Sequence, residues 1–178
     1  MSDSNLLNKS AVELKNLIQN KKISSIELTK LALAKIEETN HITNAFLTIT
    51  HDLAINSAKL VDEKIAKGDP VGLLGGVPTS IKDLEPVKGY RTTKGSLFLE
   101  NSISEIDQLG VERIKNEDGV ILGKTNVPEF GASGGTENKL EKSFESRAYP
   151  GRFKRGNSSC CSVRSTSFWP RIRWRRIN

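Results

Sequence analysis

Lys82 is a candidate for chemistry, and Ser80 lies two positions before it in a short segment that is expected to be a buried strand. Side chains two apart on a strand share one face, so a local pair of Ser80 and Lys82 is conceivable but weakly supported by the residues alone. A lysine can act as a base near pH 7 only when burial keeps it neutral. Composition alone favours a solvated charge at Lys82, so a catalytic role must be argued from its context.

A second lysine lies in residues 119–125 (GVILGKT), which have some likeness to a phosphate-binding loop. That loop needs four residues between its glycines, and here there are three, with Asp118 where the first glycine should be. The intervening residues are apolar and typical of a strand. The pattern therefore disfavours nucleotide binding.

Metal ligands are not indicated either. His41 and His51 have no ligand spacing to one another, and the adjacent pair Cys160 and Cys161 is not a Cys-x-x-Cys pair. We expect both histidines on the surface, and no metal ion or organic cofactor.

Three ordered blocks supply a context for Lys82: residues 76–83 (GVPTSIKD), 91–96 (RTTKGS) and 123–131 (GKTNVPEFG), which 135–138 (GTEN) continue. This series resembles the amidase-signature family, which includes stand-alone amidases and the A subunit of glutamyl-tRNA(Gln) amidotransferase. The resemblance covers residues 1–140, whereas the family's full domain is more than twice as long. Residues 1–140 are therefore expected to be the N-terminal, truncated part of an amidase domain.

The resemblance implies that Lys82 is the general base of a Ser-Ser-Lys triad that hydrolyses carboxylic amide C–N bonds without a cofactor. A base is needed because a serine hydroxyl is a poor nucleophile until its proton is removed. In the family the two serines lie in a Gly-Gly-Ser-Ser-Gly-Gly loop and a Gly-Ser-Asp-x-Gly-Gly-Ser loop. Both loops are absent from this chain, so we expect the product as written to be inactive.

The composition changes after Leu140. Nine of the 27 basic residues and none of the 21 acidic ones follow residue 146, which leaves 18 basic against 21 acidic residues before it. Both tryptophans and both cysteines also lie in this tail. The net charge of +6 would ordinarily suggest a nucleic-acid or anionic membrane partner, but it describes neither part of the chain.

The tail can be decoded as amidase sequence read one base out of frame. Each pair of neighbouring residues limits the codon that straddles them. The nine junctions from Ala148/Tyr149 to Gly156/Asn157 permit Arg-Thr-Pro-Gly-Gly-Ser-Ser-Gly-Gly, and the seven from Arg171/Ile172 to Ile177/Asn178 permit Gly-Ser-Asp-Gly-Gly-Gly-Ser. We interpret residues 141–178 as a frameshifted, non-native tail of irregular structure, with a short stretch lost near Leu140.

Two Ser-x-x-Glu capping boxes predict helix starts. The first helix begins after Ser10 and ends near Gln19, and the second begins after Ser24 and ends near Glu38. Amphipathic patterns predict further helices at residues 52–67 and at 105–116, the latter with Leu109, Val111 and Ile114 available for burial.

Strands are expected at residues 45–50, from Pro78 onward and at 120–123. The order strand, helix, strand favours a parallel pair with a right-handed crossover. The fold class is therefore α/β, and the resemblance implies the N-terminal fragment of a mixed sheet flanked by helices.

Neither a signal peptide nor a membrane-spanning run is evident, so a cytoplasmic protein is expected. The expected partners of the intact parent are a small-molecule amide and either a second copy or the other components of an amidotransferase, with no nucleic acid and no membrane. Two alternatives stay open: a fragment of the A subunit of glutamyl-tRNA(Gln) amidotransferase, and a non-enzymatic basic nucleic-acid-binding module, which the decoded tail disfavours.

Overall fold

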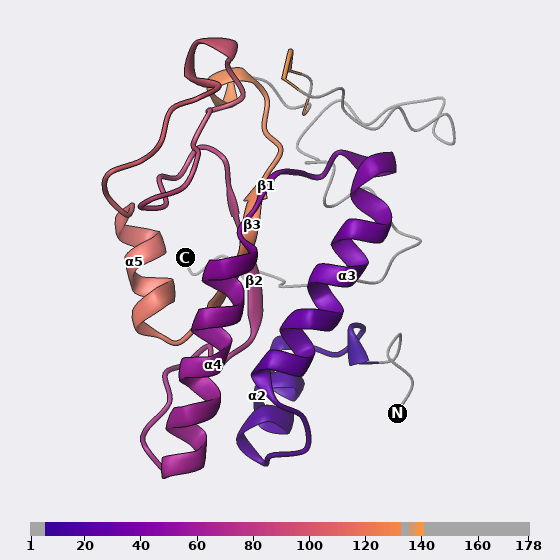
Figure 1. The fold of residues 1–178 in the computed structure, drawn as a ribbon, viewed down its shortest axis with the longest axis vertical. Helices are drawn as coiled ribbons and strands as arrows, with labels where there is room; N and C mark the ends of the chain where they lie inside the picture. Colours follow the sequence, from indigo (N-terminus) through magenta and orange to yellow (C-terminus); the bar gives the residue numbers. More distant parts are fainter. Residues whose placement is uncertain (1–5, 133–135, 137, 141–178) are drawn as a thin grey trace, which may run out of the picture.

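The computed structural model describes residues 6–132, 136 and 138–140, in which helices cover both faces of a mixed three-stranded sheet (Figure 1). The elements in chain order are α2 (Ala11–Gln19), α3 (Ser25–Thr43), β1 (Phe46–Ile49), α4 (His51–Lys67), β2 (Pro78–Lys82), the 3₁₀ turn η1 (Leu97–Leu99), α5 (Leu109–Asn116), β3 (Val120–Thr125) and the 3₁₀ turn η2 (Glu129–Gly131). The predicted α/β class is confirmed. The tail, residues 141–178, lies outside the described residues.

Both predicted capping boxes are confirmed. The Glu13 N–H donates to Ser10 Oγ at 3.2 Å and Glu13 Oε2 accepts from the Ser10 N–H at 2.8 Å, and Ser24 and Glu27 repeat this pairing at the start of α3. These contacts satisfy backbone donors that a helix leaves unpaired in its first turn. Local sequence is thus sufficient to set both helix starts.

The end of α3 was predicted five residues too early. The helix continues past Glu38 to Thr43, and Asn44 ends it in the left-handed conformation. The Thr39 and Thr43 hydroxyls donate to the carbonyl oxygens four residues before them, at 2.8 and 3.1 Å. The helix therefore runs beyond the point where the apolar periodicity ends, and these hydroxyls are satisfied within it.

The sheet has the strand order β1-β3-β2, with β3 buried along its whole length. β3 pairs parallel to β2 and antiparallel to β1, and α5 forms the crossover between the two parallel strands. Val120 and Leu122 pack against α3 and α4, whereas Ile121 packs with Val111 of α5. The predicted parallel pair is confirmed, and successive residues of β3 supply the cores on the two faces.

The predicted helix at residues 105–116 is shorter than expected, because α5 begins at Leu109. The Gln108 N–H donates to the Pro86 carbonyl at 2.9 Å and the Asp107 carboxylate accepts the Lys88 N–H at 2.8 Å. These long-range bonds hold residues 105–108 in a non-helical segment with bends at Glu105 and Ile106. Leu109 is 57% exposed, so its predicted burial was wrong, whereas Val111 is buried and Ile114 is half-buried.

Gly123 is required where the paired strands β1 and β3 approach closely, because a Cβ there would clash with the Thr48 carbonyl oxygen. We expect Gly123→Ala to lower the free energy of unfolding by about 1–3 kcal/mol, the usual cost of overpacking. Gly110 in α5 has open space around it, so Gly110→Ala should instead raise stability by about 0.4–1 kcal/mol. Urea unfolding followed by circular dichroism at 222 nm tests both, and equal effects would contradict the close approach.

His41 and His51 are both exposed, as expected. None of the helices in the described segments combines the length and apolar character needed to cross a membrane.

Candidate active site

Lys82 is the last residue of β2 and its side chain is exposed, while its neighbour Ile81 is buried. Ser80, on the same strand, is half-buried. Within residues 6–132, 136 and 138–140, the Lys82 side chain makes no hydrogen bond or ion pair, including with Ser80. A lysine base must be neutral, and burial favours the neutral form. Proton abstraction by Lys82 therefore requires a further segment that covers it.

Asp83, the residue after Lys82, is the centre of a buried polar cluster, and its side chain is fully buried. Lys124 Nζ, equally buried, lies 3.0 Å from Asp83 Oδ1 and donates to Thr92 Oγ1 at 2.7 Å. Asp83 Oδ2 accepts the Thr93 N–H at 2.9 Å and also the Thr93 hydroxyl. A buried charge is tolerated only when it is paired and hydrogen-bonded, and this cluster meets both conditions.

Lys124 is the functional candidate that the sequence prediction missed. Burial lowers the pKa of the Lys124 ammonium from its ordinary value, and the Asp83 carboxylate opposes that shift. The signal was available in residues 120–125: a lysine inside an otherwise apolar strand needs a buried carboxylate. The strand assignment also supports the rejection of a phosphate-binding loop, since all six residues of β3 are buried.

The loops beside Lys82 are tied to the cluster and to one another. The Lys94 N–H donates to the Asp83 carbonyl at 3.0 Å, and the Phe130 N–H donates to the Lys94 carbonyl at 2.7 Å. Ser96 Oγ donates to Glu129 Oε1 at 2.7 Å. The three sequence blocks at 76–83, 91–96 and 123–131 therefore meet at the Lys82 end of β2.

Two residues of these loops have unfavourable backbone conformations. Lys94 and Phe130 have φ values of 53° and 50°, in the left-handed region that side chains rarely adopt. Backbone strain of this kind is concentrated at functional sites. Lys21, Asn44 and Asp118 also have positive φ values elsewhere in the described residues, so this conformation does not by itself mark the active site.

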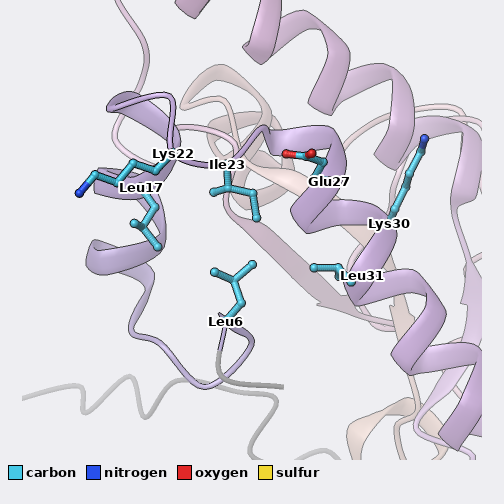
Figure 2. Close-up of a pocket in the computed structure, with 7 residues that line it drawn as sticks. All are labelled: Leu6, Leu17, Lys22, Ile23, Glu27, Lys30 and Leu31. Atoms are coloured by element: carbon cyan, nitrogen blue, oxygen red, sulfur yellow. The ribbon is translucent and has the colours of Figure 1, made fainter. Parts of the chain in front are cut away.

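A separate cavity of about 500 Å³ lies between the start of α3 and the end of α2 (Figure 2). Its lining residues are Leu6, Leu17, Lys22, Ile23, Glu27, Lys30 and Leu31. Glu27, its one carboxylate, is already bonded to Ser24 in the capping box. Leu6 packs with Val77, the residue before β2, so this cavity lies at the opposite end of the strand from Lys82.

Comparison with known proteins shows which family the chain is similar to. A family model described as Amidase matches residues 27–144. The A subunit of glutamyl-tRNA(Gln) amidotransferase from Clostridium botulinum is 45% identical over 135 residues, which are 76% of this chain and 28% of that protein. The chain therefore spans less than a third of the length of this curated relative.

Solved structures show the same partial match. A bacterial aryl acylamidase of the amidase-signature family superposes with a TM-score of 0.70 at 33% identity, over 73% of this chain and 27% of that one. A protein from a vestigial complex linked to the origins of an s-triazine catabolic enzyme gives a TM-score of 0.77 at 29% identity, over 85% and 33%. In both, the fold described above is one part of a longer chain.

Proposed function

Since the chain belongs to the amidase family, we propose that its intact parent hydrolyses a carboxylic amide and that Lys82 is the general base. The observation that carries this proposal is the convergence of the three sequence blocks on Lys82, with the buried Asp83 and Lys124 pair fixing the strand end behind it. Fixed geometry of this kind is what proton transfer in a catalytic triad requires.

The reaction would proceed by acyl transfer. Neutral Lys82 would accept the proton of a middle serine as that serine accepts the proton of the nucleophilic serine, whose oxygen then attacks the amide carbon. The leaving amine would take a proton as the C–N bond breaks, and water would hydrolyse the acyl-enzyme. No step needs a metal ion or an organic cofactor.

The chain as written lacks both serine loops, so we propose that it is inactive and that its residues 141–178 are read one base out of frame. Residues 1–140 are then the N-terminal part of the amidase domain. The support is the ordered decoding of both serine loops from the residue junctions. DNA sequence across codons 138–145 tests this, and an intact frame in independent clones, with no alternative frame that encodes the two loops, would refute it.

A glutaminase function within an amidotransferase is the second candidate. It is favoured by the 45% identity to the amidotransferase protein of Clostridium botulinum, against 33% to the aryl acylamidase. In that case the parent would release ammonia from glutamine for its partner proteins.

The two candidates are separated by restoring the frame and comparing two substrates. We expect hydrolysis of an aryl or aliphatic amide from a stand-alone amidase, and ammonia release from glutamine from an amidotransferase component. Ammonia is measured by a coupled enzyme assay and the arylamine by absorbance. Activity on neither substrate, in a folded and frame-restored protein, would contradict both candidates.

A further inference from the structure

The cavity between the end of α2 and the start of α3 has an apolar interior. Figure 2 shows four aliphatic side chains that point toward one another across it from three parts of the chain: Leu6, Leu17, Ile23 and Leu31. Leu6 is buried and the other three are half-buried, so part of their apolar surface faces the cavity. Its volume of about 500 Å³ is within the range of about 300–1,000 Å³ that is usual for small-molecule sites.

The turn after α2 holds one wall of this cavity in place. Lys21 has a φ of 55°, and its N–H donates to the Ile18 carbonyl at 2.9 Å. The next N–H, that of Lys22, donates to the Leu17 carbonyl at 2.9 Å. These two bonds form the Schellman motif that ends many helices, and they hold the backbone of Lys22 against that of Leu17. Ile23 follows directly, so this wall is formed before any ligand binds, which lowers the entropy cost of binding.

The rim of the cavity has an excess of positive charge. Its charged residues are Lys22, Glu27 and Lys30, which are all exposed, and Figure 2 shows the two lysines on opposite sides of the apolar interior. Glu27 Oε2 accepts from the Ser24 N–H at 2.9 Å and from the Ser24 hydroxyl at 3.0 Å. Neither lysine ammonium, by contrast, forms an ion pair with any residue that the structure describes.

An apolar interior with a basic rim is complementary to a molecule that has an aliphatic chain and one negative charge. We propose that this cavity binds a medium-chain aliphatic carboxylate, with the chain among the four aliphatic side chains and the carboxylate between Lys22 and Lys30. A lysine carries its charge at the end of a long flexible stem, so both ammonium groups can turn toward the carboxylate. The cavity lies at the opposite end of β2 from Lys82, so this site is independent of the proposed function.

The test is isothermal titration calorimetry of the full chain with octanoate, butyrate and 1-octanol. We expect one octanoate to bind per chain. Butyrate should bind about tenfold more weakly or worse, because it lacks four methylene groups that are each worth about fourfold in affinity when fully buried. 1-Octanol has the same number of carbon atoms without the charge, so it should bind about threefold more weakly or worse.

A double variant, Lys22→Glu with Lys30→Glu, separates the rim from the interior. It should weaken octanoate binding by about tenfold or more and leave 1-octanol binding unchanged, because it reverses the charge of both lysines and keeps the apolar side chains. The matched control is Lys59→Glu with Lys88→Glu, which changes two exposed lysines outside the cavity and alters the net charge equally. This control should keep its octanoate affinity within about twofold of the wild type.

Circular dichroism at 222 nm checks that each variant is folded, and glutamine replaces glutamate at both rim positions if the first double variant is not. Octanoate should also raise the midpoint of thermal unfolding of the wild type more than that of the rim variant. Three results would each overturn the proposal: no saturable binding of octanoate, equal octanoate affinity in the wild type and the rim variant, or binding of butyrate or 1-octanol as tight as that of octanoate. Equal affinity in the rim variant would mean that octanoate binds elsewhere, as on the basic residues after residue 146.

Discussion

Replacing Lys82 by alanine in the frame-restored protein is expected to lower kcat for amide hydrolysis by a factor on the order of 10⁴ or more, because members of a catalytic triad act as a unit. KM should change little, since the lysine acts on the serines and not on the substrate. The measurement is steady-state kinetics on the better substrate of the pair proposed above.

Lys88 supplies the control for this experiment. It is an exposed lysine six residues further along the chain, and its described contact is through its backbone N–H to Asp107. Lys88→Ala should keep kcat within about twofold of the wild type. A Lys82→Ala enzyme that retains a tenth of the activity would show that another group is the base.

Lys124→Met is expected to lower the free energy of unfolding of the chain by about 3–5 kcal/mol, the cost of leaving a buried charge without its partner. The variant would leave the Asp83 carboxylate, which has no exposure to water, without its ion-pair partner. Such a loss is comparable with the whole stability of a small domain. We therefore expect urea unfolding at 222 nm to shift to much lower concentrations or to lose its cooperative transition.

Two further variants separate the loss of the buried ion pair from the general effect of replacing a lysine by methionine. Lys35→Met removes the half-buried partner of the exposed Glu38 and should cost about 0.5 kcal/mol or less. Asp83→Asn combined with Lys124→Met removes both charges, so the double variant should be more stable than the sum of the single effects predicts. Strictly additive effects would show that Asp83 and Lys124 are not coupled.

The parts of the fold that could be predicted from the sequence are those with local causes. Ser10 and Ser24 start helices because their partners Glu13 and Glu27 are three residues away. The start of α5 could not be predicted in this way, because Gln108 is held by Pro86 through a bond that depends on the tertiary fold.

The candidate site shows the same division. The composition around Lys82 favoured a solvated charge, and the side chain is exposed in the described structure. The ion pair of Asp83 and Lys124 was missed because its members are 41 residues apart and meet only when β2 and β3 pair.

The strand order has a consequence for synthesis. β3 lies in the middle of the sheet yet is the last strand of the sheet to be made, so β1 and β2 have no strand to pair with until Thr125 has left the ribosome. Nascent chains that end before β3 would present two open strands to chaperones. Once β3 emerges, all three strands of the described sheet are available to pair.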